Sequence, residues 1–269
     1  VWSTSQVASS VGTIIMLLLL LLLPHEAFLS WGWRVPFIVG FIVAIFGIIY
    51  RYTLAESFLF SEVKEAGKTV RLPSLEVFRY YWSKIVKLLV LEITLGVPFY
   101  TFALIVISYL VLLHVNPVYA MVVSAVGTAA GYPAAILGGY LADKVGRKPV
   151  LIYSQLGLIF IIIPWFIVMN SKIFPLMILL NIIGIISQEI GLGAFNVYVN
   201  ENFPTAYRVS GSSLAIQLGG IGVGFAPTYI MAIIDGHPYS NYIYAAILEI
   251  ILLIIGILVV LVMEEPRDN

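Results

Sequence analysis

Three glutamates stand inside long apolar stretches of the sequence: Glu92, Glu189 and Glu249. An ionised side chain at the centre of a membrane helix costs about 3 kcal/mol, so a carboxyl there is a functional candidate by default. Burial disfavours the charged form of a carboxyl, which suits such a group to bind and release a proton. These residues therefore predict the binding of a proton or a polar solute in an apolar environment.

Glu189 carries the strongest of these predictions. It follows Gln188 and shares its apolar stretch with Asn181, Asn196 and Tyr198, which gives a polar stripe at roughly helical spacing. We interpret the stripe as candidate ligands for a proton or a polar substrate. The alternative is a neutral Glu189 that hydrogen-bonds to a neighbouring helix and has no part in transport.

Glu92 and Glu249 carry weaker predictions. Glu92 precedes Thr94 and a proline break at Pro98, and it is a second candidate for proton or substrate binding. Glu249 lies in the last apolar stretch of the chain, where a structural or interfacial role is expected.

Eight apolar stretches are long enough to hold these residues in a membrane whose hydrocarbon core is about 30 Å thick. Each is continuously apolar over about 20 residues, which favours helices over the alternating strands of a barrel. Closely spaced glycines at Gly127–Gly131 and Gly219–Gly224 favour close packing between these helices, and the alternative for the second group is a flexible helix that lines a cavity. The expected spans are Val7–Leu23, Val35–Tyr50, Ile85–Leu113, Val118–Leu141, Val150–Val168, Ile173–Val199, Val209–Ile234 and Tyr242–Met263. The fold class is an all-α integral membrane protein.

Composition excludes several classes of protein. Hydrophobic residues make up 61% of the chain and charged residues 10%, whereas soluble domains carry about 25% charged residues. A net charge of +0 gives no basic field for nucleic acid, so none is expected as a partner. The sequence has no cysteine, and its histidines have no metal-ligand company. It lacks the residue constellations of intramembrane enzymes, so neither catalysis nor a cofactor is predicted.

Basic residues divide the loops into two sides. The longest polar stretch, residues 51–84, reads as a linker between residues 1–50 and a bundle over residues 85–263, with a short tail at 264–269. Nearly all Lys and Arg residues fall on the side of this linker, and only Arg34 and Lys172 fall on the other. The positive-inside rule then places the linker and both ends of the chain in the cytoplasm, with the protein in the plasma (inner) membrane.

A charged motif lies at one of the expected turns. It runs from Gly139 through Asp143, Lys144, Gly146 and Arg147 to Lys148, and Asp143 can pair with the basic residues across the turn. This pattern resembles the cytoplasmic signature of the major facilitator superfamily. The resemblance implies a gate that holds the two halves of a transporter together in one state. The alternative is that these residues only turn the chain and fix its orientation.

Further stretches narrow the resemblance. They are Trp31-Gly-Trp-Arg-Val-Pro-Phe37, Glu201-Asn-Phe-Pro-Thr-Ala-Tyr-Arg-Val-Ser-Gly211 and Gln217-Leu-Gly-Gly-Ile-Gly-Val-Gly-Phe-Ala-Pro227. They resemble the metabolite:proton symporter family, which includes proline/betaine, α-ketoglutarate, citrate and shikimate carriers. One departure is that Gly193 is followed by Ala194, where the family commonly has proline.

The resemblance also sets the architecture. It implies that the eight spans are helices five to twelve of a twelve-helix transporter, with residues 1–50 as the last two helices of the N-terminal half. By the same resemblance, the first four helices, needed for a full transport unit, are missing from this chain. The spans of Glu92 and Glu189 become the cavity-lining seventh and tenth helices, and the substrate site is expected between the halves near the midplane.

The expected function is proton symport of a small polar metabolite or osmolyte by alternating access. No Lys or Arg lies in the core of a span, and a quaternary ammonium binds well against aromatic rings, so a zwitterion such as proline or betaine is favoured. The alternatives are a dicarboxylate symporter of the α-ketoglutarate type and a truncated remnant that does not transport. The coupling ion is expected to be a proton, with sodium left open, and the expected partners are the solute and the lipid bilayer.

Overall fold

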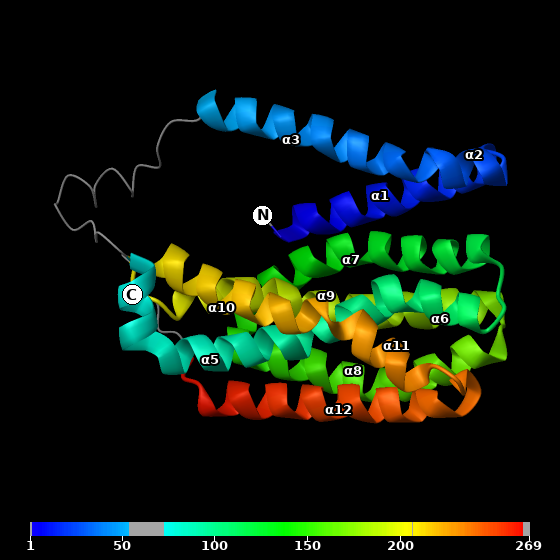
Figure 1. Cartoon of the computed structure of the whole chain (residues 1–269). Coiled ribbons are helices and arrows are strands. Elements are labelled where there is room, and N and C mark those ends of the chain that lie inside the picture. The colour runs from blue at the N-terminus through cyan, green and yellow to red at the C-terminus, as the bar shows by residue number, and fades with distance from the viewer. Residues whose placement is uncertain (1, 54–72, 206, 266–269) are drawn as a thin grey trace.

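The structure is a computed structural model that describes residues 2–53, 73–205 and 207–265. Long helices lie side by side along one common direction (Figure 1), and the described residues contain no strand. The elements are α1 (Trp2–Leu22), α2 (His25–Ser30), the 3-10 helix η1 (Gly32–Arg34), α3 (Val35–Thr53), α5 (Pro73–Tyr100), the π-helix η2 (Thr101–Ile105), α6 (Val106–Leu112), α7 (Pro117–Val145), α8 (Arg147–Ser171), α9 (Phe174–Glu201), α10 (Arg208–Gly224), α11 (Ala226–Ile234) and α12 (Pro238–Val262).

The all-helical membrane fold expected from the sequence is confirmed. Seven helical segments of the described chain are long and apolar enough to cross a membrane. They are Gly32–Tyr50, Glu76–Leu112, Pro117–Val145, Arg147–Ser171, Phe174–Glu201, Arg208–Ile234 and Pro238–Val262. The remaining expected span coincides with α1, whose described apolar part, Val11–Leu22, is shorter than these seven.

Several helices extend beyond their apolar stretches at one end of the bundle. α3 ends and α5 begins at this end, which we call the linker end; the opposite one is the loop end. α5 begins at Pro73, inside the range expected to be a linker, and residues 54–72 of that linker lie outside the described residues. α8 begins at Arg147 and not at Val150, because a polar first turn can continue a helix into the interface when its N–H groups find partners.

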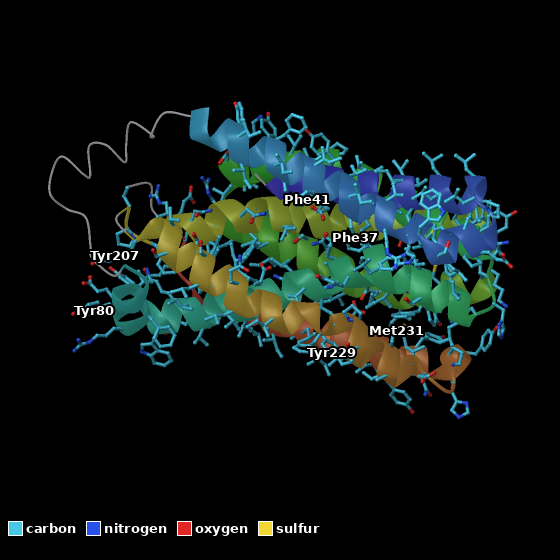
Figure 2. The ribbon with its side chains drawn as sticks, turned by 45° about the horizontal axis from the view of Figure 1, so that its top comes forward. Phe37, Phe41, Tyr80, Tyr207, Tyr229 and Met231 are labelled. Carbon is cyan, nitrogen blue, oxygen red and sulfur yellow. The ribbon has the colours of Figure 1, made fainter. Side chains whose placement is uncertain are left out.

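The packing places α9 at the centre of the bundle. α9 lies against α7 and α8, α10 lies against α5, and α12 lies against α8 and α5. α1 packs on α7, and α3 forms the outer edge beyond α1 (Figure 1). The exposed side chains of α3, among them Phe37 and Phe41, are almost all apolar (Figure 2).

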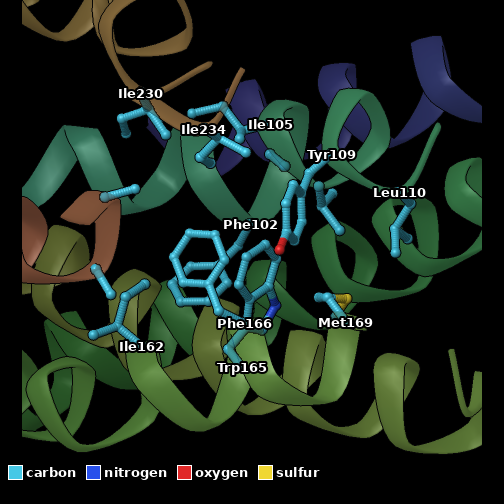
Figure 3. Close-up of a cluster of buried hydrophobic side chains, with 14 of the residues drawn as sticks. Phe102, Ile105, Tyr109, Leu110, Ile162, Trp165, Phe166, Met169, Ile230 and Ile234 are labelled. Carbon is cyan, nitrogen blue, oxygen red and sulfur yellow. The ribbon is translucent and has the colours of Figure 1, made fainter. Parts of the chain in front are cut away.

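Two clusters of buried side chains hold the bundle together. The cluster toward the loop end gathers the rings of Phe102, Tyr109, Trp165 and Phe166 (Figure 3). Phe102 meets Trp165 edge-on at 5.4 Å between ring centroids, a favoured geometry for aromatic pairs. The second cluster lies toward the linker end, with Phe195 of α9 among its members.

α5 and α6 form one spanning segment with a break in its middle. Pro98 lacks a backbone N–H, so it cannot complete the regular hydrogen-bond ladder. The π-helix η2 follows directly, and such turns often mark functional sites in helices. The break therefore leaves carbonyl groups that neighbouring helices must satisfy.

Candidate functional site

Glu189 lies in the interface between α9 and α7. Its side chain is 1% exposed, and neither carboxylate oxygen has a hydrogen-bond partner among the described residues. A Cβ at Gly131 of α7 would come within 3.0 Å of the Glu189 Cγ, so that glycine makes room for the carboxyl. A buried, unpartnered carboxyl of this kind is suited to take up a proton or a polar ligand.

The other residues of the α9 stripe point to different neighbours. Asn181 accepts a hydrogen bond from Trp165 Nε1 at 3.0 Å and donates to the carbonyl oxygens of Phe102 and Val123 at 3.2 and 3.0 Å. Because its amide is fully used in this way, Asn181 braces α9 against η2, α7 and α8.

Gln188 and Tyr198 also bond to neighbouring segments. Gln188 donates to the Leu95 carbonyl of α5 at 3.3 Å, which leaves its own oxygen without a partner among the described residues. The Tyr198 hydroxyl donates to the Glu264 carbonyl at 3.1 Å.

Asn196 is the member of the stripe that shares a helix face with Glu189. The two residues are two turns apart on α9. Asn196 donates to Leu192 of its own helix at 2.8 Å, and its buried Oδ1 has no partner within the described part of the chain. Glu189 and Asn196 therefore place side-chain oxygens without described partners on one face of α9, and the free oxygen of Gln188 is the remaining one of the stripe.

Glu92 lies in a different interface. Its side chain is 7% exposed, and its Oε2 has no partner among the residues that the structure describes. A Cβ at Gly219 of α10 would meet its Cβ and Cγ at 2.7 Å, so Glu92 packs between α5 and α10. The structure therefore does not bring Glu92 and Glu189 together within one helix interface.

The glycine predictions hold at most of the positions concerned. Gly127 and Gly131 pack against Asn181 and Ile185 of α9, as close helix packing requires. In the second group, Gly219 and Gly222 pack against α5, whereas a Cβ at Gly220 or Gly224 would meet nothing within 4 Å.

The charged motif sits where α7 meets α8 at the linker end. Arg147 lies 3.1 Å from Asp143 and 2.8 Å from Glu201, the last residue of α9. A second contact from its Nε to Glu201 at 2.9 Å makes this pair two-pronged. The guanidinium therefore joins the ends of α7, α8 and α9. Glu201 was not predicted as a site residue, since it lies far from the motif in the sequence.

Glu265 provides a second charged contact at this end. Its carboxylate accepts the backbone N–H groups of Arg147 and Lys148 at 2.7 and 3.2 Å. These amides belong to the first turn of α8, where a helix has no internal acceptors and carries partial positive charge. Lys148 also donates from Nζ to the carbonyl of Met263 at 2.5 Å. Lys144 lies over the ring of Tyr140, 4.6 Å from its centroid.

The glycines of the motif have separate roles. Gly138 is pressed against the backbone of Ile190, whereas a Cβ at Gly139 would meet nothing within 4 Å. Gly146 is the only residue between α7 and α8, with φ of 96°. This backbone region is strained for other residue types, so glycine is the residue that fits the joint.

Hydrogen bonds also tie α5 to the residues directly after α9 and directly before α10 at the linker end. Lys84 donates to the Asn202 carbonyl at 3.2 Å, and the Tyr207 hydroxyl donates to Glu76 at 2.8 Å. This bond to Glu76 raises the pKa of the Tyr207 phenol, because the carboxylate stabilises the protonated form. Tyr80 and Tyr207 both lie at this end (Figure 2).

No group of metal-binding side chains occurs within the described ranges. Most charges of those ranges lie toward the helix ends, and the buried charged residues are Glu92, Glu189 and Glu249. The described basic residues of the linker-end parts of the helices are Arg51, Arg79, Lys84, Lys87, Lys144, Arg147, Lys148 and Arg208, and those of the loop end are Arg34 and Lys172.

Comparison with known proteins relates the chain to membrane carriers. The family model of the Major Facilitator Superfamily matches residues 1–227. The chain is 25% identical over 275 residues to the glycine betaine/proline/ectoine/pipecolic acid transporter of Dickeya dadantii, an alignment that covers 96% of the chain and 53% of that transporter.

Two relatives from Escherichia coli K12 give the same result. The chain is 30% identical over 230 residues to an inner membrane metabolite transport protein, covering 80% of the chain and 50% of that protein. It is 25% identical to a proline/betaine transporter, covering 96% of the chain and 53% of that protein. The chain thus spans about half the length of the curated relatives it matches.

Proposed function

The chain belongs to the Major Facilitator Superfamily, and from this premise we propose that it is part of a secondary transporter for a small zwitterionic osmolyte, driven by protons. The observation that carries the proposal is Glu189, a buried carboxyl whose oxygens have no partner among the described residues. Uncompensated burial of such a group is costly, so its presence favours a use in binding.

The substrate class rests on the chemistry of the spans and on the relatives. Proteins named as proline/betaine transporters match almost the whole chain. A zwitterion presents a cation that suits an acidic residue, and the buried charged residues of the described chain are all acidic. We therefore infer a proline- or betaine-like substrate in preference to a dicarboxylate.

The coupling proton would bind at Glu189 in this proposal. Its position within the α7–α9 interface links the carboxyl to both helices, because Gly131 allows close contact there. Protonation removes the cost of a buried charge, whereas release of the proton restores it. The two forms therefore favour different helix separations, which is what alternating access needs.

The linker-end contacts of Arg147 would act as the gate. Asp143, Arg147 and Glu201 join three helix ends through ion pairs, and such pairs are made or broken as units when helix ends move. By the positive-inside rule, the basic linker end and both ends of the chain lie in the cytoplasm, in a plasma (inner) membrane protein.

The test is uptake of labelled proline and betaine by cells that lack their own osmolyte uptake. The protein is expressed from its complete reading frame, with and without a protonophore. Glu189→Gln is compared with Glu26→Gln, a matched change at an exposed glutamate of α2. Membrane content of each variant is measured by immunoblot.

The expected result is protonophore-sensitive uptake that Glu26→Gln preserves. Glu189→Gln should lower uptake by about tenfold or more, the effect of losing one charge-assisted interaction. Uptake that is insensitive to protonophore would contradict proton coupling. Failure of well-inserted protein to take up either compound would contradict the osmolyte assignment.

A further inference from the structure

Glu249 is the third buried carboxyl of the described spans. Its helix, α12, lies on the opposite side of the bundle from α1 and α3 (Figure 1). The sequence predicted a structural or interfacial role for Glu249. The structure encloses it completely, with 0% exposure. Its Oε1 accepts a hydrogen bond from Thr101 Oγ1 at 2.8 Å, and its Oε2 has no partner among the described residues.

The partner of this carboxyl belongs to the break in α5. Thr101 is the first residue of the π-helix η2 and follows Pro98 by one helical turn. Its hydroxyl lies 2.8 Å from Glu249 and 3.4 Å from the carbonyl oxygen of Val97. A hydroxyl carries one hydrogen, so Thr101 can donate to one of these acceptors at a time.

Further polar side chains lie between α5, α8 and α12 on the linker-end side of Glu249. Gly256, two turns after Glu249, packs against Thr94 of α5 and Gln155 of α8. The Thr94 hydroxyl lies 3.5 Å from the Gln155 side-chain oxygen. Glu249 is therefore part of a buried polar seam between α5, α8 and α12, separate from the α7–α9 interface that holds Glu189.

We propose that Glu249 is a reversible proton-binding site, and that the Thr101 hydroxyl transmits its protonation state to the break in α5. When Glu249 is ionised, Thr101 donates its hydrogen to the carboxylate. When Glu249 takes up a proton from water, the carboxylic acid donates to Thr101 Oγ1, and the Thr101 hydrogen turns to Val97. The hydrogen bond from the Thr101 hydroxyl of η2 to the Val97 carbonyl of α5 thus depends on the proton at Glu249.

The titratable neighbours of Glu249 are few. On α11, Tyr229 is partly buried and lies within electrostatic range of the carboxyl. On α5, Glu92 lies more than two turns from Thr101 toward the linker end. On α8, Arg147 and Lys148 lie in the first turn at that end, and Tyr153 is exposed. The proton at Glu249 therefore has Tyr229 as its one close titratable neighbour in the described residues.

The proposal goes beyond the proposed transport function and is tested without measuring transport. Infrared difference spectra are recorded on the protein in lipid bilayers between about pH 5 and about pH 9, a range that spans raised carboxyl titrations. The background is Glu92→Gln/Glu189→Gln, in which Glu249 is the remaining buried carboxyl of the described spans. Adding Glu249→Gln is compared with adding Glu26→Gln, and circular dichroism checks the helical content of each protein.

The expected result is a carboxylic-acid band that grows as the pH falls and disappears only with Glu249→Gln. Absence of a pH-dependent band in the background protein would overturn the site. If Glu249→Gln does not fold, Thr101→Val supplies the second measurement, with Thr101→Ser as its matched control. Loss of the hydroxyl removes the donor to the ionised form, so the band should persist to about one pH unit higher. An unchanged titration in Thr101→Val would overturn the link to α5.

Discussion

Arg147 at the start of α8 and Glu201 at the end of α9 form a two-pronged ion pair, with nitrogen–oxygen distances of 2.8 and 2.9 Å. Their side chains are 17% and 27% exposed, so the pair is partly shielded from water. The pair joins residues from opposite ends of two sequential helices, and Asp143 extends it to α7. Its contribution can be measured directly.

Replacing Arg147 by Lys or Glu201 by Gln should each lower stability by about 1 kcal/mol. Lys keeps the charge but loses the planar fork that contacts both carboxylate oxygens. For a chain of this size, about 1 kcal/mol corresponds to about 3 °C in the melting temperature of the purified protein. The double variant should lose less than the sum of the two single variants. Strict additivity would mean that the pair has no coupling energy.

Replacing Glu265 by Gln should loosen the first turn of α8. The carboxylate accepts two backbone N–H groups there, and losing a capping acceptor costs about 1 kcal/mol. Hydrogen exchange at the backbone amides of Arg147 and Lys148 should become several-fold faster, as that free energy implies. Glu264→Gln is the matched control, since Glu264 is exposed and the amides of this turn bond to Glu265 instead. Equal protection in both variants would contradict the cap.

Replacing Asn181 by Leu should destabilise the protein by about 2 kcal/mol, because three buried groups lose their partner at once. These are the carbonyls of Phe102 and Val123 and the Trp165 indole N–H. Asn200→Leu is the control, since the Asn200 amide bonds within α9 and is exposed. Thermal unfolding in detergent measures both. A melting temperature for Asn181→Leu equal to that of Asn200→Leu would show that the brace is not needed.

Adjacent glycines of α7 should respond very differently to substitution by alanine. At Gly138 a Cβ would collide with the backbone of Ile190, which cannot rotate away, whereas at Gly139 it would meet nothing within 4 Å. We expect Gly138→Ala to cost about 1–3 kcal/mol by overpacking, and Gly139→Ala to be neutral for folding. Chromatography and thermal unfolding report the difference. Similar losses in both variants would contradict the close approach of α7 and α9 at Gly138.

Hydropathy predicted the spans because every spanning helix must cover its backbone with apolar side chains. It could not predict how far helices continue at the linker end, as at Pro73 and Arg147, because the first turns there contain polar or charged residues. The close packing at Gly127 and Gly131 was predictable from spacing, since small residues recur where helices approach.

The partners of charged residues were less accessible from sequence. Glu201 and Glu265 are far from Arg147 along the chain, and only the fold brings their carboxylates to it. The burial of Glu249 depends on the rotation of α12, which is apolar on all sides and gives no sign of which face is inside. The polar stripe on α9 was predicted from its spacing. The spacing does not say which neighbouring helix each of its side chains contacts, because that depends on how the helices are placed around α9.

The single-residue joint at Gly146 has a mechanical consequence. Because no loop separates α7 from α8, a tilt of α7 must also move the start of α8. The ion pair of Arg147 with Glu201 couples the end of α9 to the same point. The ends of these three helices are therefore expected to move together about the backbone of Gly146. A displacement of these helix ends should therefore move α7 and α9 as whole helices and change the contact between Gly131 and Glu189. Since Glu265 is bonded to the first turn of α8, movement of the C-terminal segment should change the same contact.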